Sequence, residues 1–254
     1  MLYRFLLAFT LCVFISAGTA RADFAAGKAA FDQKNWAAAT QFLLPLAQEG
    51  DADALLLFGK MYADGLGVPQ DPGKAFDLFL RSSQKGNAEA MVSVAALYSG
   101  GQGVEANKKA ALEWFRKAAE LNNSVAQFAV GMALAAGDEK IGLQSDLVDS
   151  YKWLSLAGRD RDLPLRMRST ANKLAKHIYD KQMEIKNRPA ADEALKNWKQ
   201  KKWEDIAQTH IHWNTETGQD IATVAPDQAA PSPQEPETVP DDNQGETVPD
   251  GDSE

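Results

Sequence analysis

The sequence predicts an all-α protein built from stacked helix pairs, and two observations carry that prediction. A segment of 36 residues occurs twice in succession, at 50–85 and 86–121, and a diverged third copy follows at 122–157. Within each copy, small and apolar residues recur at spacings of three and four, and glycines cluster between two such runs, which is typical of two helices joined by a short link. Because one helix pair cannot bury its apolar face alone, consecutive pairs must stack.

The two full copies align without a gap. Aromatic, small and glycine positions coincide at the 36-residue offset: Ala54 with Ala90, Tyr62 with Tyr98, Gly65 with Gly101, Gly67 with Gly103, Ala75 with Ala111, and Phe79 with Phe115. The third copy keeps Gly131 but has Leu134 in place of the tyrosine. It then slips by three residues within a diverged loop at 138–145, so that Trp153 corresponds to Trp114.

Glycine and alanine have two expected roles in the repeats. Small residues at Ala54, Gly59 and Ala90 would let helix axes approach closely. The Gly-x-Gly-Val links at 65–68 and 101–104 are predicted to end helices, because glycine tolerates the positive φ found there. A phosphate-binding loop is the alternative, but no strand precedes these glycines and no Lys-Ser/Thr pair follows them.

The repeated pattern is Ala-x3-Φ-Gly-x2-Tyr-x2-Gly-x-Gly-Val, where Φ is apolar, followed by Ala-x3-Phe-x2 and two Ser/Ala positions. It resembles the Sel-one-like repeat family, relatives of the tetratricopeptide repeats, over 50–157, and less closely over 23–49, which we expect to be a degenerate helix pair. The resemblance implies a right-handed α-solenoid. It also implies an adaptor with a concave groove for other proteins, commonly in envelope signalling, polysaccharide assembly or host contact.

The family suggests that the first helices of the pairs line this groove. The positions turned away from Phe58, Tyr62 and Tyr98 are then the candidates for partner binding: Leu57, Lys60, Ser93, Ala96, Ala129 and Met132. An apolar groove would suit an amphipathic helix or an extended segment. The alternative is that Leu57 and Met132 are ordinary packing residues.

Residues 158–213 are expected to form basic C-terminal capping helices, with Pro164 in a first helical turn and Asp180 as an N-cap. The stretch 159–202 holds 13 Lys and Arg against six Asp and Glu. Such a surface is usually a solvated face; the alternative is that it meets an acidic partner, anionic lipid or the chain's own tail. The basic residues include Arg159, Arg161, Arg166, Arg168, Lys199, Lys201 and Lys202.

The tail, residues 214–254, is predicted to be disordered. It has 11 acidic residues, no Lys or Arg, no aromatic residue, and six of the 11 prolines, so it cannot bury enough apolar surface to offset the entropy of ordering. The net charge of −8 therefore reflects the tail, the folded part is near neutral, and nucleic-acid binding is not indicated.

No catalytic, cofactor-binding or metal-binding residues are predicted. The three histidines are His177, His210 and His212, too few in any one place for a zinc site. The pair Ser82-Ser83 stands where the next copy has two alanines, which favours packing over a nucleophilic role. The sequence therefore favours a non-enzymatic interaction scaffold, with an envelope hydrolase and a structural role at the membrane surface as alternatives.

Residues 1–22 are interpreted as a cleaved secretory signal, which predicts a periplasmic or secreted protein. Arg4 precedes an apolar stretch, and Ala20-Arg21-Ala22 has the small-x-small pattern that a signal peptidase accepts. The alternative is an uncleaved anchor, although the apolar stretch is shorter than the roughly 20 residues that span a bilayer. Cys12, the one cysteine, lies within this stretch, so the mature fold cannot use disulfides.

We expect the mature chain to begin at Asp23. Mass spectrometry of the N-terminal peptide of the purified protein measures this directly. A chain that retains residues 1–22 would contradict the cleavage and favour the anchor.

Overall fold

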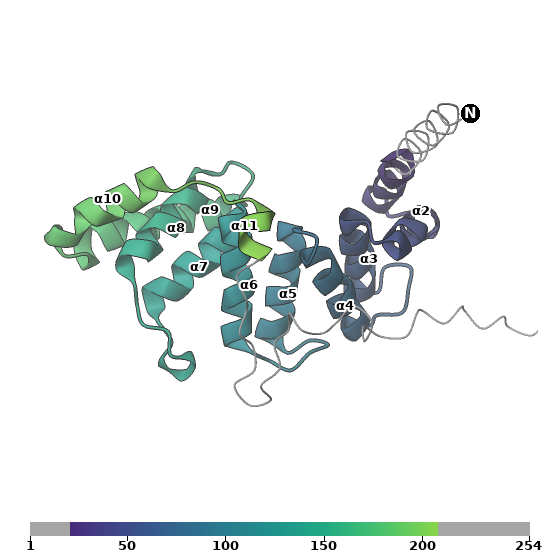
Figure 1. Cartoon of the computed structure of the whole chain (residues 1–254), viewed down its shortest axis with the longest axis horizontal. Coiled ribbons are helices and arrows are strands. Elements are labelled where there is room, and N and C mark those ends of the chain that lie inside the picture. Colours follow the sequence, from purple (N-terminus) through teal and green to yellow (C-terminus); the bar gives the residue numbers. More distant parts are fainter. Residues whose placement is uncertain (1–20, 208–254) are drawn as a thin grey trace, which may run out of the picture. The chain divides into compact units, whose positions relative to one another are not determined.

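The computed structural model describes residues 21–207, and these form an α-solenoid of consecutive helix pairs (Figure 1). Within this range the only β-type backbone pairing is one isolated antiparallel bridge between Asp138 and Leu143. Most of the predicted signal segment, Cys12, His210, His212 and the acidic tail at 214–254 lie outside the described residues. None of the described helices is both long and apolar enough to cross a membrane.

The helices of the repeats have nearly equal lengths, 12 to 14 residues. Residues 21–32 are helical and precede the first labelled helix. The helices are α2 (Trp36–Glu49), α3 (Ala52–Asp64), α4 (Pro72–Ser83), α5 (Ala88–Gly100), α6 (Lys108–Glu120), α7 (Ser124–Ala136) and α8 (Leu147–Arg159). The pairs α3–α4, α5–α6 and α7–α8 are therefore the three predicted repeats.

Each helix from α2 to α8 begins at an Asn or Asp whose side chain accepts a hydrogen bond from a backbone N–H of the first turn: Asn35, Asp51, Asp71, Asn87, Asn107, Asn123 and Asp146. Such a cap satisfies a backbone donor that the helix leaves unpaired. The helices α3 and α5 end at Gly65 and Gly101, whose φ angles are 69° and 64°. This confirms that the glycines of the links terminate helices.

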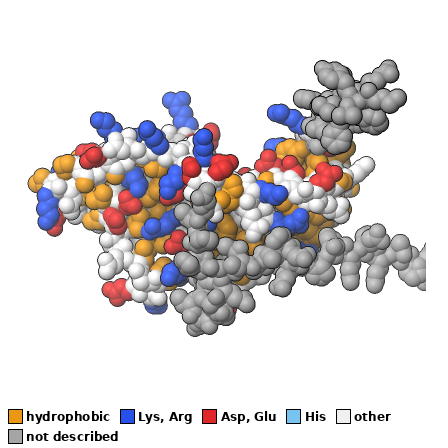
Figure 2. All heavy atoms as spheres, in the orientation of Figure 1, with side chains coloured by type: hydrophobic (Ala, Val, Ile, Leu, Met, Phe, Trp, Pro, Cys, Tyr) orange, Lys and Arg blue, Asp and Glu red, His pale blue; other side chains and the backbone are white. Residues whose placement is uncertain are grey.

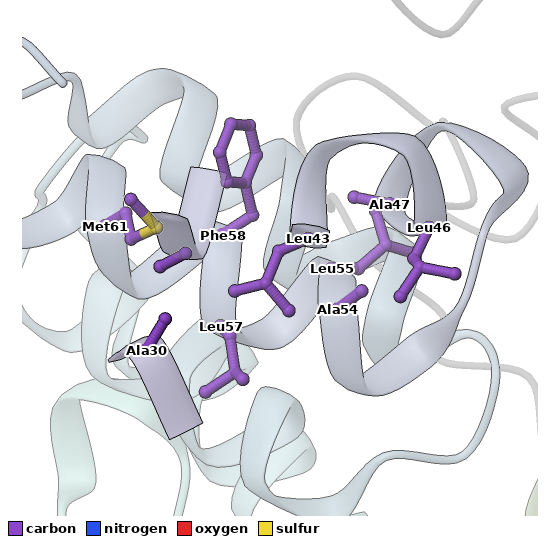
Figure 3. Close-up of a cluster of buried hydrophobic side chains, with 10 residues drawn as sticks. Ala30, Leu43, Leu46, Ala47, Ala54, Leu55, Leu57, Phe58 and Met61 are labelled. Carbon is purple, nitrogen blue, oxygen red and sulfur yellow. The ribbon is translucent and has the colours of Figure 1, made fainter. Parts of the chain in front are cut away.

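Small residues bring the two helices of a pair close together, as predicted. A Cβ atom on Gly59 would lie 2.7 Å from the ring of Phe79, and one on Gly131 would lie 2.7 Å from Cγ of Leu154. The side chains of Ala75, Phe79 and Ser82 are buried on the facing side of the second helix. The packed interior continues into the N-terminal pair (Figure 3), where side chains of α2 and α3 form one cluster that includes Leu43, Leu46, Ala54, Leu55, Phe58 and Met61.

The links also contact the preceding pair. A Cβ on Gly67 would overlap Cβ of Trp36, the first residue of α2, and a Cβ on Gly103 would overlap the backbone of Pro72, the first residue of α4. Each link therefore lies directly on the start of the second helix one repeat earlier, at a distance that a side chain would prevent.

The third link, residues 137–146, is three residues longer than the two links before it, which confirms the predicted slip. It contains a short 3-10 helix (Glu139–Ile141) and the bridge between Asp138 and Leu143. Lys108 at the start of α6 pairs with Asp138 at 3.3 Å, so the longer link remains attached to the second repeat.

The cap consists of α9 (Leu165–His177), a π turn (Ile178–Gln182), a 3-10 turn (Ile185–Asn187) and α10 (Arg188–Asn197). Both α9 and α10 pack on α8, around a core that includes Leu163, Ile178, Met183 and Ala191. Two details differ from the sequence prediction. Pro164 lies at the N-cap, one residue before the first turn of α9, and Asp180 lies within the π turn, where it pairs with Lys176 at 2.8 Å.

The chain leaves the cap after α10, contrary to the expectation of capping helices up to residue 213. Residues 198–202 are not helical, and α11 (Trp203–Ala207) follows. We call residues 198–207 the strap. Its backbone is bonded to the second repeat, where the N–H of Lys201 donates to the carbonyl oxygen of Glu120 at 3.0 Å.

The contact between the links and the preceding helices predicts that alanine substitution destabilises the fold by different amounts at two glycines with the same φ angle. Gly103 and Gly142 both have φ of 70°, but a Cβ on Gly142 would meet nothing within 4 Å. Both Gly→Ala changes should cost about 1–2 kcal/mol for left-handed backbone. Gly103→Ala should cost a further amount of about 1–3 kcal/mol because of overpacking.

The free energy of unfolding, measured in urea by far-UV circular dichroism, tests this difference. Gly142→Ala is the matched control for backbone strain. Equal destabilisation by the two changes would mean that the link does not depend on its approach to α4.

Candidate functional site

The six predicted partner-binding residues fall into two sets that repeat along the solenoid. Positions 57, 93 and 129 are separated by 36 residues, as are 60, 96 and 132. The first members lie on α3, the second on α5 and the third on α7. The structure therefore places equivalent positions on the first helix of each pair, as the sequence predicts.

Five of these residues have surface available to a partner. Lys60, Ser93 and Ala129 are half-buried, and Ala96 and Met132 are exposed. Met132 is 39% exposed, and among the described residues the other exposed large hydrophobic side chains are Leu165 and Ile185 of the cap region. We call these five residues, Lys60, Ser93, Ala96, Ala129 and Met132, the first-helix face.

Leu57 differs from the other five. Its side chain is only 8% exposed and belongs to the cluster that contains Ala30 of the N-terminal helical segment, Leu43 of α2 and Phe58. The N-terminal pair covers this part of α3, so Leu57 is a packing residue. Burial therefore agrees with the packing alternative for Leu57, whereas Met132 is exposed and its contact with a partner stays a prediction.

Polar contacts connect α3 to α5 beside the first-helix face. Lys60 Nζ lies 2.6 Å from Glu89 Oε1, and Asn87 Nδ2 donates to Asp53 Oδ1 at 2.8 Å. Because both charges of the Lys60–Glu89 pair are partly exposed, it contributes only about 0–1 kcal/mol to stability. Its main effect is to orient the lysine along the face.

Sequence reasoning missed Glu89, although a signal for it exists. Glu89 occupies the position of Asp53 one repeat later, and Asp53 precedes Lys60 by two helical turns on the same helix. Because Asp53 and Lys60 lie on the same side of α3, the repeat places Glu89 on the corresponding side of α5. The sequence could therefore have predicted that Lys60 faces an acidic residue of the next first helix.

The buried serines are bonded to the backbone. Ser82 Oγ donates to the carbonyl oxygen of Ala52 at 2.6 Å, Ser83 Oγ to that of Leu80 at 2.7 Å, and Ser150 Oγ to that of Gly131 at 2.7 Å. The Ser82 and Ser150 hydroxyls connect the two helices of a pair, whereas the Ser83 hydroxyl bonds within its own helix α4. Both serines of the Ser82-Ser83 pair are buried and hydrogen-bonded to backbone, which agrees with the packing role predicted for them. No cluster of three or more His, Cys, Asp or Glu side chains occurs within residues 21–207.

Groups with shifted pKa values are distributed over different helices. Burial raises the pKa of Tyr98 on α5 to about 12. Burial also lowers the pKa of Lys117 on α6 and, with the nearby charge of Asp71, raises the pKa of Asp77 on α4. These shifts have local causes and do not converge on a reaction centre.

The cap carries an open hollow of about 340 Å³ between α8, α9 and α10. Its wall includes the rings of Tyr151 and Tyr179, which are tilted by 39° relative to each other with centroids 4.9 Å apart. The Tyr179 hydroxyl donates to Asp192 at 2.7 Å, which raises the pKa of the tyrosine. Figure 2 shows lysine and arginine side chains standing out over this part of the molecule.

Three consecutive segments of the chain, 52–87, 88–123 and 124–162, match the model of the Sel1 repeat. The chain contains three Sel1 repeats. The first two matches have the 36-residue period found in the sequence, and the third is longer, in agreement with the extended link between α7 and α8. Sel1-repeat proteins are protein–protein interaction scaffolds.

One solved structure shows the similarity of fold, and a second was matched with a lower score. A Sel1 repeat protein from Oxalobacter formigenes is 28% identical with a TM-score of 0.54, and the match covers 61% of this chain and 60% of that protein. The match to c5321, a protective antigen of uropathogenic Escherichia coli strains with an SLR fold, has 18% identity and a TM-score of 0.41, and covers 81% and 52% of the two chains. This chain therefore spans less than two thirds of either protein. The comparison with curated proteins gave no match.

The different environments of Leu57 and Met132 predict different costs of truncation. Leu57→Ala should lower the free energy of unfolding by about 2–5 kcal/mol, because it leaves a cavity among packed side chains. Met132→Ala should lower it by less than about 1 kcal/mol, because the methionine is largely surface. Urea unfolding of both variants measures this. A large loss from Met132→Ala would place that residue in the core and remove it from the first-helix face.

Proposed function

We propose that the protein is an exported, non-enzymatic scaffold that binds a partner protein through the first-helix face. The observation that carries the proposal is that accessible residues recur every 36 positions, at the same place on α3, α5 and α7. Such recurrence gives an extended surface that contacts several parts of one ligand. Sel1-repeat proteins are interaction scaffolds, and the match of this chain to the Sel1 repeat supports the same function here.

The chemistry of the face suits an amphipathic helix or an extended segment. Met132 presents a flexible apolar side chain, and Ala96 and Ala129 leave room for the side chains of a ligand. At the other end of the face, Lys60 and Glu89 offer one charge of each sign. A partner segment with an apolar stretch at one end and polar residues at the other would match this order.

Export to the periplasm or the medium is proposed from the signal pattern at residues 1–22. A scaffold in that location would act in envelope signalling or assembly. The alternative of an envelope hydrolase gains no support from the described residues, where Ser82 and Ser150 donate to backbone carbonyls.

Met132→Asp should abolish capture of the partner, because it places a charge on the apolar part of the face. Leu165→Asp is the matched control: Leu165 is an exposed hydrophobic residue (70%) on the cap, so the same change adds the same charge away from the face. Crosslinking of each tagged variant in the envelope fraction, followed by quantitative mass spectrometry, identifies proteins captured by the wild type and the control but lost from Met132→Asp.

Circular dichroism of the two variants establishes that both retain their helices. If Met132→Asp and Leu165→Asp capture the same proteins in the same amounts as the wild type, the first-helix face is not the binding surface.

A further inference from the structure

The strap crosses the repeats in the direction opposite to the order of the chain. It starts at Trp198, whose ring meets that of Trp153 on α8 edge-on, with centroids 6.2 Å apart. It then reaches the end of α6 and finally the link between α4 and α5, where α11 lies (Figure 1). The strap, a non-helical stretch followed by the short helix α11, thus contacts α8, the end of α6 and the link after α4 of its own chain.

Polar contacts attach the strap to the end of α6. Besides the bond from Lys201 N–H to the Glu120 carbonyl, Gln200 Nε2 donates to the carbonyl oxygen of Leu121 at 3.2 Å. Lys201 Nζ also lies 2.8 Å from Glu120 Oε2. The last carbonyls of a helix have no N–H partner within the helix and carry partial negative charge. The end of α6 therefore offers acceptors to any extended basic segment.

An aromatic residue attaches the strap to the first repeat. Trp203 covers Gly86, where a Cβ would lie 2.7 Å from Cγ of the indole. Gly50, the equivalent glycine one repeat earlier, has almost the same φ (87° against 89°) but faces only the end of the Lys85 side chain, at 3.7 Å. Ile206, three residues after Trp203, is 1% exposed, so α11 places one aromatic side chain over Gly86 and buries a second apolar side chain.

We propose that the edge formed by Gly86, Glu120 and Leu121, the strap seat, is a peptide-docking surface that the strap occupies in cis. A partner protein occupies it in competition through a short segment of the same chemistry: basic extended residues followed by an aromatic residue and, three positions later, an aliphatic one. The proposal concerns a surface separate from the first-helix face and does not depend on the function proposed for that face.

The contacts of the strap are of a kind that a competitor can replace. A helix of five residues such as α11 is too short to form without its docking site. The Lys201–Glu120 pair is half exposed, at 50% and 31%, and such pairs contribute little. Docking therefore depends on Trp203 and Ile206, which a second segment with the same two anchors would match.

The test uses the full chain and a fluorescein-labelled peptide with the sequence of residues 198–207. Trp203→Ala and Ile206→Ala together empty the strap seat without altering it. The peptide should bind this double variant at least tenfold more tightly than the wild type, measured by fluorescence anisotropy. Hydrogen exchange at the Lys201 amide should become at least tenfold faster in the double variant.

Two glycine changes in the double variant locate the binding. Gly86→Ala should abolish peptide binding, because its Cβ occupies the place of the indole. Gly50→Ala introduces the same backbone strain at an equivalent position and should leave binding unchanged. A second peptide with alanine in place of Trp203 should not bind either protein.

Three results would overturn the proposal. Equal affinity of the peptide for the wild type and the double variant would place peptide binding away from the strap seat, and no binding to either would make the strap a permanent part of the fold. Unchanged exchange at Lys201 in the double variant would show that the anchors do not hold the strap. A dimer of the wild type by light scattering, with Lys201 exchange that depends on protein concentration, would assign the seat to a second copy of the chain.

Discussion

The structure depends on how closely each link approaches the helix pair before it. At Gly67 and Gly103 the link lies against the first residue of α2 or α4 with no space for a Cβ. The same requirement acts within the pairs at Gly59 and Gly131. Protein interiors are close-packed, so a shift of a fraction of an ångström changes the contacts. The absence of a Cβ at these glycines therefore sets the distance between helices. The Asn and Asp N-caps, which recur at a fixed register, set where each helix starts.

This regular spacing explains why the surface of the solenoid is both repetitive and variable. Equivalent positions return on each first helix, but their side chains differ, as Lys60, Ala96 and Met132 show. Packing restricts the residues that face the neighbouring helix and leaves those on the outer side free to change. A scaffold of this kind holds the geometry of its ligand contacts constant while their chemistry changes from repeat to repeat.

The sequence predicts features that follow from periodicity and misses those that do not. The repeats, the terminating glycines and the three-residue slip are all visible as a pattern at an offset of 36, and all are present in the structure. The burial of Leu57 depends on the N-terminal pair that covers α3, and residues 23–49 match the pattern too weakly to reveal that contact. The strap has no periodicity, and its hydrogen bond from Gln200 joins residues 79 positions apart.

The path of the strap also relates its length to the number of repeats. Its contacts begin at Trp153 on α8 and end at Gly86 in the link after α4, so its ten residues reach from the third repeat to the end of the first. An inserted fourth repeat would separate these contacts by two more helices, because consecutive helices pack on one another along the solenoid, and the strap would need further extended residues to reach Gly86. The length of residues 198–202 is therefore matched to the number of repeats that the strap crosses. Duplication of a repeat would require a longer segment at 198–202 for the same contacts to form.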